Sequence, residues 1–133
     1  MIWLGKDVAN IVEGEIKINP AGVDVKAAEI WKIAEDGIAT FYGKVRSVEK
    51  MKIEPSEDGF YYLPKGTYEV RIAAKVKFPL NAVGFLLPRS SLNRLGILKS
   101  DTALIDPGYE GYPTQTIRVT VGELRIHKDE YWF

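Results

Sequence analysis

An all-β fold, either a barrel or a jelly-roll-like sandwich of sheets, is what this sequence predicts. Short runs alternate between apolar and polar side chains, which is the pattern of half-buried strands. Turn-forming pairs such as Asn19-Pro20, Asp58-Gly59 and Lys65-Gly66 separate these runs. Long helical patterns do not alternate with the strands, so a parallel α/β fold is disfavoured. The 133 residues suggest one domain with room for one core.

Two stretches carry the strand pattern most clearly. Glu69–Phe78 is expected to be one strand, because every second residue in it is apolar. Its expected inner face consists of Val70, Ile72, Ala74, Val76 and Phe78. A later strand is expected to turn the following residues inward: Ile117, Val119 and Val121, and after Gly122 also Leu124 and Ile126.

Two short helical segments are expected among the strands. The segment Lys6–Val12 could form one amphipathic helix that ends at Gly14. The segment Ser90–Leu95 lacks strand alternation and is expected to form a single helical turn. It begins with two hydroxyl residues, either of which could serve as the N-cap.

The composition excludes several kinds of chemistry and partner. Lys+Arg and Asp+Glu both number 18, so no excess of charge favours nucleic acid or a membrane surface, and we expect neither partner. Because the chain has no Cys, disulfides, thiolate metal sites and a Cys nucleophile are excluded. The single His, His127, cannot form a multi-His zinc site by itself. The N-terminal residues contain no apolar run suited to a signal peptide or membrane span, so a cytoplasmic location is expected.

Asp24 lies in the first of three segments that depart from simple strand patterning, Pro20–Val25. Between two valines, an ionised carboxylate needs partners or solvent. From the residues alone, a strand residue on the solvent face is the favoured interpretation, and a functional carboxylate is the alternative.

The second segment, Leu87–Gly96, concentrates two arginines and two serines around an expected helix start. Guanidinium forks, short hydroxyl donors and free helix N–H groups together suit an anion or a phosphate. A capped turn with exposed arginines explains the same residues equally well. The residues concerned are Arg89, Ser90, Ser91 and Arg94.

In the third segment, Thr102–Gly111, an apolar run stops at Asp106, which opens a Pro-Gly turn with Tyr109 three residues later. A carboxylate at the rim of an apolar strand can be a general base if it reaches a water beside an electrophile. Opening a turn is also a common structural role for Asp, and the residues alone favour that interpretation.

Taken in order, the three segments resemble successive motifs of the dUTPase / dCTP-deaminase superfamily. PAGVDV is similar to its Ala-Gly-x-Asp motif, PRSSL to its Pro/Gly-Arg-Ser-Ser/Gly-Leu motif, and ALIDPGYEG to its Ile-Asp-x-x-Tyr/Trp-x-Gly motif. The stretch DVANIVEGEIKINPAGVDV also resembles the deaminase-like branch, to which some compact archaeal-type dUTPases belong. The resemblance implies a dUTPase-like β-barrel or jelly-roll-like sandwich over residues 1–133. It further implies a homotrimer with active sites between subunits.

The resemblance also implies a reaction, the hydrolysis of dUTP to dUMP and pyrophosphate. Asp106 would activate a water for attack on the α-phosphate, and Tyr109 would pack on the deoxyribose and exclude a 2′-hydroxyl. Asp24 would support a Mg²⁺ ion through water molecules, as suits an ion that keeps its hydration shell.

The remaining roles that the resemblance implies concern substrate binding. The serines Ser90 and Ser91 would hold the phosphate chain, and Arg89 and Arg94 would neutralise it or organise the interface around it. The backbone of the hairpin Leu98–Ile105, including Ala103 and Leu104, would read the uracil edge.

Two departures from the family pattern bear on function. The deaminase branch carries a glutamate in the strand after the third motif, and counting from Asp106 gives Thr116 here, beside Gln115. Since neither is a carboxylate, cytosine deamination is disfavoured. The second departure is that the sequence stops at Phe133, without the C-terminal strand and Gly-rich tail of many dUTPases, so it is expected to be either truncated or a reduced family member. Its last three residues are aromatic and are expected to pack against the barrel or a neighbouring subunit.

Three functions therefore remain in competition. The leading hypothesis is a dUTP diphosphatase. A dCTP deaminase or a bifunctional deaminase–diphosphatase is the second, and a weakly catalytic nucleotide-binding relative is the third.

Overall fold

The computed structural model describes residues 2–101 and 104–133 and is built around a five-stranded antiparallel sheet. Its strand order is β11-β14-β8-β4-β7. The two long strands, β8 (Phe60–Ile72) and β14 (Thr114–His127), pair at its centre. They are flanked by β4 (Ala27–Ile33), β7 (Lys50–Ile53) and β11 (Ile97–Lys99).

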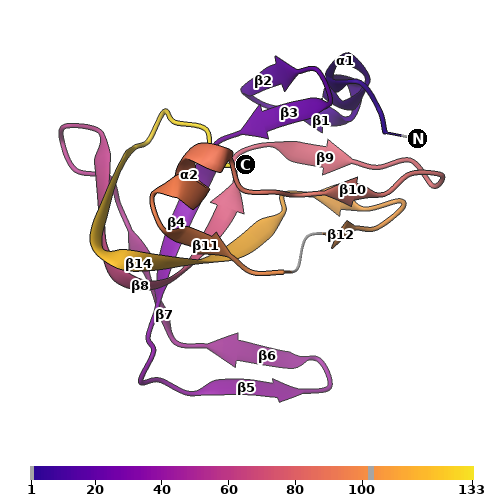
Figure 1. Cartoon of the computed structure of the whole chain (residues 1–133). Coiled ribbons are helices and arrows are strands. Elements are labelled where there is room, and N and C mark those ends of the chain that lie inside the picture. The colour runs from indigo at the N-terminus through magenta and orange to yellow at the C-terminus, as the bar shows by residue number, and fades with distance from the viewer. Residues whose placement is uncertain (1, 102–103) are drawn as a thin grey trace.

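Smaller sheets and short helices complete the molecule (Figure 1). One three-stranded sheet has the order β1-β9-β13, and the hairpins β2–β3, β5–β6 and the pair β10–β12 are two-stranded. The β5–β6 hairpin extends away from the rest. The bounds are β1 (Val12–Glu13), β2 (Ile16–Asn19), β3 (Gly22–Val25), β5 (Ala39–Tyr42), β6 (Val45–Val48), β9 (Lys75–Lys77), β10 (Gly84–Phe85), β12 (Leu104–Ile105), β13 (Glu110–Gly111), α1 (Gly5–Val8), the 3₁₀ helix η1 (Ala9–Ile11) and α2 (Ser90–Arg94). The predicted all-β fold is confirmed.

The prediction of a single strand over Glu69–Phe78 is wrong. Strand β8 ends at Ile72 and β9 begins at Lys75, because the chain passes here from the five-stranded sheet to the three-stranded sheet. At the break, the Ala73 N–H donates to the Lys26 carbonyl at 2.8 Å. The alternation continues across the break, since Ala74 and Val76 are both buried.

The second predicted strand is confirmed, with one error in its inner face. The register between β14 and β8 shifts between Val119 and Glu123, so residues 120–122 of β14 lie opposite the single residue Lys65 of β8. Such a bulge changes which face a side chain points to. Val121 is therefore exposed, whereas Leu124 on the far side of the bulge is buried as predicted.

Both predicted helical segments exist, with different ends. The first is split into α1 and η1, and Val12 already belongs to strand β1. The second is α2, whose N-cap is Arg89, not a serine, and no side chain caps it. The predicted serine cap is therefore wrong, and the hydroxyls of Ser90 and Ser91 are not used for that purpose.

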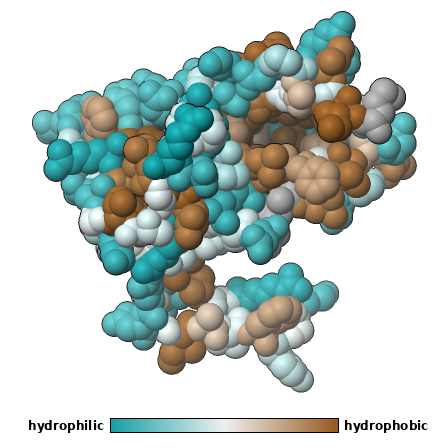
Figure 2. Space-filling view, in the orientation of Figure 1, coloured by the Kyte–Doolittle hydropathy of each residue, from teal (hydrophilic) through white to brown (hydrophobic). Residues whose placement is uncertain are grey.

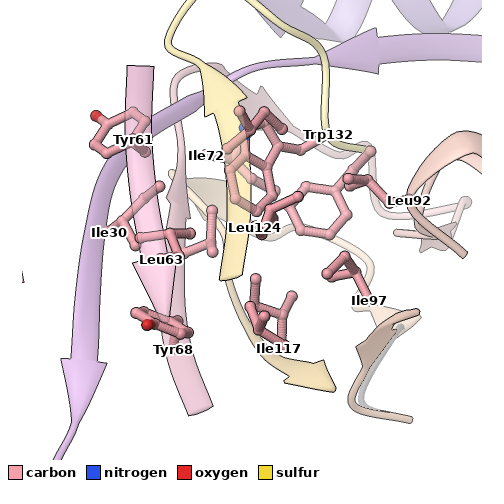
Figure 3. Packing of buried hydrophobic residues seen from close by; sticks show 14 of the residues in the cluster. Ile30, Tyr61, Leu63, Tyr68, Ile72, Leu92, Ile97, Ile117, Leu124 and Trp132 are labelled. Carbon is pink, nitrogen blue, oxygen red and sulfur yellow. The ribbon is translucent and has the colours of Figure 1, made fainter. Parts of the chain in front are cut away.

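One hydrophobic core lies on the inner face of the five-stranded sheet (Figure 3). Side chains from β4, β8, β11 and β14 meet there with Leu92 of α2. Trp132 and Phe133 are also part of this core, with 0% and 4% exposure. The expectation that the C-terminal aromatic residues pack against the barrel is thus confirmed for these two.

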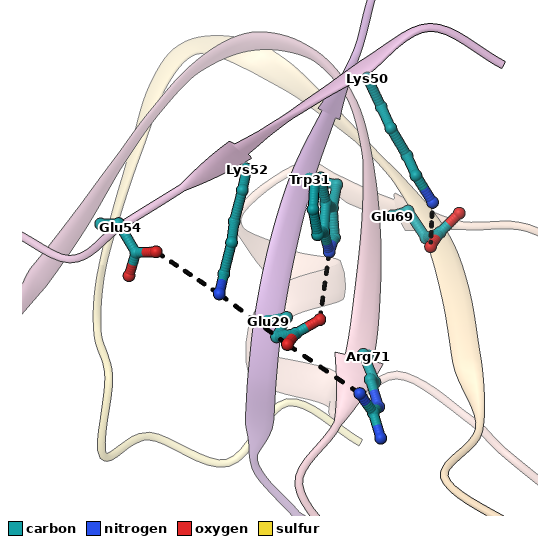
Figure 4. A network of polar contacts seen from close by, with 7 residues as sticks. All are labelled: Glu29, Trp31, Lys50, Lys52, Glu54, Glu69 and Arg71. Carbon is teal, nitrogen blue, oxygen red and sulfur yellow. Dashed lines mark hydrogen bonds and ion pairs between the residues drawn. The ribbon is translucent and has the colours of Figure 1, made fainter.

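The outer face of the same sheet is polar (Figure 4). Glu29 accepts a hydrogen bond from the Trp31 indole at 3.3 Å and lies within 4 Å of both Lys52 and Arg71. Lys50 pairs with Glu69 at 3.0 Å. A sheet with one apolar and one charged face explains the strong alternation in the sequence. Among the residues described, no helix is long and apolar enough to span a membrane.

Candidate active site

Helix α2 presents the arginine and serine residues of the second motif. Leu92 is 4% exposed and fixes the helix to the core, while Ser90, Ser91 and Arg94 are exposed. With Leu92 buried, the neighbouring positions of so short a helix point outward. Two hydroxyl donors and one guanidinium therefore face solvent together and can meet an anionic ligand.

Arg89 plays a different part from Arg94. Its Nε lies 3.3 Å from Oδ2 of Asp24, and both side chains are largely shielded from water. The other oxygen of Asp24 accepts a hydrogen bond from Asn19 Nδ2 at 2.8 Å. The structure thus brings the first and second motifs together, and Asp24 joins the β2–β3 hairpin to the start of α2.

The C-terminal residues hold the same junction from the other side. The Trp132 N–H donates to the Val25 carbonyl at 2.8 Å, and Val25 donates to Phe133 at 2.7 Å. The Arg89 N–H donates to the Trp132 carbonyl at 3.1 Å, and its Nη1 donates to Tyr131 at 3.3 Å. Residues 131–133 therefore lie between β3 and α2 and fix the position of the serine-bearing helix.

Asp106 opens a tight turn on the surface. Its carbonyl accepts a hydrogen bond from the Tyr109 N–H at 3.1 Å, with Pro107 second and Gly108 third, at a φ of 78°. Proline at the second position and a positive-φ glycine at the third are the signature of a type II turn. The turn is tied to the end of β9 because Phe78 donates to the Tyr109 carbonyl at 2.8 Å. The predicted turn is confirmed, and the Asp106 side chain is exposed on a fixed backbone.

The Tyr109 ring folds back over Gly111. A Cβ added at Gly111 would lie 3.2 Å from the Tyr109 hydroxyl, and Gly111 has a φ of 155°. The positive φ favours glycine at this position, and a side chain there would also crowd the Tyr109 hydroxyl. The third motif thus encodes one unit, in which the turn joins Asp106 to Tyr109 and Gly111 leaves room for the Tyr109 ring.

The segment after α2 forms a hollow of about 480 Å³. It is lined by residues 97–101, together with Leu87, Pro88 and Asn93. Burial lowers the pKa of the Lys99 ammonium, and nearby Asp101 acts in the opposite direction. Leu104 pairs with Phe85 and is exposed, whereas Ala103 lies outside the described residues. The hollow connects α2 to the hairpin that was expected to read a base.

At the position where the deaminase branch carries a glutamate, this chain has no acidic residue. Gln115 is buried in β14, and Thr116 points to the other face. The two acids nearest in sequence pair with cations of their own: Glu110 with Lys75 at 3.4 Å and Glu123 with Arg125 at 2.8 Å.

Sequence reasoning missed three residues of this region: Asn19, Lys99 and Tyr131. Asn19 reaches Asp24 across the β2–β3 hairpin, five positions along, and Lys99 donates to the carbonyl of its neighbour Ser100, so both contacts are local. Tyr131 meets Arg89 from 42 positions away. None of the three motifs contains these residues, so motif spacing does not identify them. His127 lies apart, with its ring edge-on to Phe60 at 5.1 Å and its Nδ1 accepting the Asp129 N–H. These contacts give it a structural role.

The site residues divide into two groups on one chain. The Asp24–Arg89 pair, α2 and the hollow form one group, and the Asp106–Tyr109 turn forms the other. No hydrogen bond or ion pair joins the two groups within the described residues. Together they define an all-β protein with exposed groups suited to an anionic ligand.

Comparison with known proteins gives the family. Residues 6–130 match the family model described as dCTP deaminase-like. The chain belongs to this family.

Relatives carry two different names. The deoxyuridine 5'-triphosphate nucleotidohydrolase of Methanocaldococcus jannaschii is 37% identical over 107 residues, which cover 79% of this chain and 68% of that protein. A probable enzyme of the same name from Aeropyrum pernix is 37% identical over 121 residues, covering 84% and 70%. A dCTP deaminase of Haemophilus influenzae is 34% identical over 107 residues, covering 71% of this chain and 55% of its own length.

The fold has a counterpart among solved structures. A 2'-deoxycytidine 5'-triphosphate deaminase from Agrobacterium tumefaciens superposes with a TM-score of 0.67 over 93% of this chain and 41% of that chain. At 15% sequence identity, this likeness establishes the fold alone.

Proposed function

We propose that this protein is a dUTP diphosphatase that hydrolyses dUTP to dUMP and pyrophosphate. The observation that carries the proposal is the similarity to archaeal proteins named deoxyuridine triphosphate nucleotidohydrolase, at 33 to 37% identity. The lack of a carboxylate at Gln115 and Thr116 supports it against deamination, because that reaction needs a group to carry protons at this position.

In the proposed reaction, Asp106 takes a proton from a water molecule as the water oxygen attacks the α-phosphorus. The bond from the α-phosphorus to the bridging oxygen breaks, and pyrophosphate leaves with that oxygen. The exposed Asp106 carboxylate suits this role, since a general base must reach a water beside the substrate. The backbone turn around it holds its position before substrate arrives.

Phosphate binding is assigned to Ser90, Ser91 and Arg94, which are exposed on α2. Arg89 is better suited to holding α2 in place, because its guanidinium already pairs with Asp24. Tyr109 is assigned to the sugar, where its ring would leave no room for a 2′-hydroxyl. The backbone of the hairpin 98–105, with Ala103 and Leu104, is assigned to the uracil.

A Mg²⁺ ion is proposed to accompany the triphosphate. No group of three or more His, Cys, Asp or Glu side chains that could hold a metal exists in the described part of the chain. Asp24 accepts one contact on each oxygen, which leaves roughly two of its four lone-pair positions for water. Those positions fit an ion bound through its own water molecules, which would screen charge on the departing pyrophosphate.

A homotrimer with shared sites is part of the proposal. The α2 residues Ser90, Ser91 and Arg94 and the Asp106–Tyr109 turn lie on separate elements and are exposed, so a ligand could be enclosed only if another surface approached them. Closed cyclic symmetry is common among oligomers and would supply that surface.

The test is to incubate the protein separately with dUTP and dCTP in the presence of Mg²⁺. Pyrophosphate from dUTP alone supports the proposal. Ammonia from dCTP supports the second candidate function, which the Haemophilus relative's name favours. Binding without product would contradict both.

The Asp106→Asn variant tests the mechanism. We expect kcat to fall roughly 10²–10⁴-fold with nucleotide binding kept, since the amide retains the shape but cannot accept the proton. Asp7→Asn, at an exposed acid on α1, is the matched control and should keep the wild-type rate. Hydrolysis by Asp106→Asn at the wild-type rate would refute the assignment.

A further inference from the structure

The loop between β9 and β10, residues 79–83, lies against the turn that carries Asp106. Strand β9 leads into this loop and pairs with β13, and β10 leads out of it and pairs with β12 (Figure 1). Strands β12 and β13 are also the two strands on either side of the turn 106–109. Because the same two ladders hold the ends of both segments, the loop and the turn lie side by side.

Backbone hydrogen bonds join the loop to the turn. The Gly108 N–H donates to the Pro79 carbonyl at 3.2 Å, and the Phe78 N–H donates to the Tyr109 carbonyl at 2.8 Å. The Phe78 ring also closes the start of the loop onto its end, since a Cβ added at Gly84 would lie only 2.2 Å from the ring atom Cζ. The loop therefore holds the turn from one side along its whole length.

The Leu80 side chain extends this contact to the middle of the turn. A Cβ added at Gly108 would lie 3.0 Å from Cδ2 of Leu80, so the leucine occupies the space beside that glycine. Gly108 is the residue of the turn with the most conformational freedom, and its φ of 78° lies in the left-handed region. A side chain packed against it disfavours other backbone conformations of the turn.

Burial in the core does not explain Leu80. Its side chain is 86% exposed, the highest value among the large apolar residues that the structure describes. Figure 2 shows hydrophobic residues gathered at this end of the molecule, where β10 and β12 lie. A surface residue of this kind contributes little to stability. An effect of Leu80 on activity would therefore come through the turn that it contacts.

We propose that Leu80 is a positioning residue for Asp106 and acts through Gly108. This inference rests on the proposed function, in which Asp106 is the general base. A base is effective only if it is held at the right distance and angle to the water, and a misplacement of about 1 Å can cost about 100-fold in rate. The Asp106 side chain is exposed, so the protein can restrain it chiefly through the backbone of its turn.

Kinetics of Leu80→Ala test the role. We expect kcat for dUTP to fall about tenfold while KM stays within about twofold, because the turn loses a restraint and the phosphate-binding helix does not change. Leu80→Met restores an apolar side chain of similar volume and should recover most of kcat. Ile38→Ala is the matched control, since it removes a 73% exposed apolar side chain outside the site, and should keep the wild-type rate.

Hydrogen exchange measures the restraint itself and needs no substrate. The amides of Gly108 and Tyr109 donate to the carbonyls of Pro79 and Asp106, and both should exchange about fivefold faster in Leu80→Ala. Amides of the β8–β14 ladder should exchange at the wild-type rate in the same protein. Sedimentation should give the same mass for Leu80→Ala as for the wild type at equal concentration.

The outcomes separate this inference from the proposed function. Unchanged kcat in Leu80→Ala, unchanged exchange at the two turn amides, or a raised KM at constant kcat would each overturn the positioning role. A changed sedimentation mass would also overturn it, because Leu80 would then act through a subunit contact. In all these cases, wild-type release of pyrophosphate from dUTP leaves the proposed function standing. A wild type that releases none overturns the proposed function, and the role of Leu80 with it.

Discussion

Replacing Trp132 by alanine should remove a large part of the stability of this protein. The side chain is fully buried, lies among Ile72, Leu92 and Leu124 in Figure 3, and has its ring centroid 6.3 Å from that of Phe133. Truncating a buried tryptophan to alanine costs about 3–5 kcal/mol, from lost transfer free energy and the cavity left behind. Domains unfold with a free energy of about 5–15 kcal/mol, so the variant should be strongly destabilised.

The Trp132→Phe variant separates two contributions to that cost. The indole Nε1–H is buried and finds no acceptor among residues 2–101 and 104–133. An unsatisfied buried donor costs about 1–3 kcal/mol, which phenylalanine would recover. This gain offsets much of the lost volume, so we expect Trp132→Phe to lie at least about 2 kcal/mol above Trp132→Ala in unfolding free energy.

Urea unfolding of the wild type and both variants measures the differences in unfolding free energy, provided that the free energy falls with urea concentration at the same slope in all three proteins. Tyr131→Ala is the control, because Tyr131 is less buried and gives its carbonyl, not its side chain, to Arg89. The reasoning is refuted if Trp132→Ala costs less than about 1 kcal/mol, or if phenylalanine is as costly as alanine.

Two further predictions concern the site. Tyr109→Ala should narrow the preference for dUTP over UTP, and Gly111→Ala should do the same because its new Cβ would displace the Tyr109 ring. Competition kinetics with both nucleotides measure the preference. Unchanged selectivity in folded variants would count against the assignment of Tyr109 to the sugar. Arg94→Ala should weaken dUTP and pyrophosphate binding together and leave deoxyuridine binding unchanged. Arg89→Ala should also lower the unfolding free energy by about 1–3 kcal/mol, since Asp24 loses its cationic partner and keeps only Asn19. Calorimetry measures the binding and urea unfolding the stability, and equal stability of both variants would contradict the division of roles.

The strand pattern and the turn chemistry were readable from the sequence because both are local. Alternation at every second residue reports which face of a strand is buried. It identified β14 with most of its inner residues, but only the C-terminal end of β8, from Glu69 to Ile72. The turn at Asp106 followed from Pro and Gly, whose backbone preferences do not depend on their surroundings. The motifs likewise identified the family, because their order and spacing are properties of the chain.

The tertiary structure decided which strands pair and in which register. The break between β8 and β9 keeps the alternation intact, so only the exchange of sheet partners reveals it. The bulge that exposes Val121 depends on the register against β8, which the sequence of β14 does not contain.

The same limit applied to the site. Arg89 and Arg94 are five positions apart in one motif and look alike in sequence, yet one lies against Asp24 and the other faces solvent. Tyr131 lies 42 positions from Arg89, so nothing local assigns it to that junction. Sequence by itself determined the fold class, the family and the chemical groups available, since these depend on residue type and spacing. Only the packing of β3, α2 and residues 131–133 against one another decided which of those groups are held in place by the protein and which remain exposed to solvent.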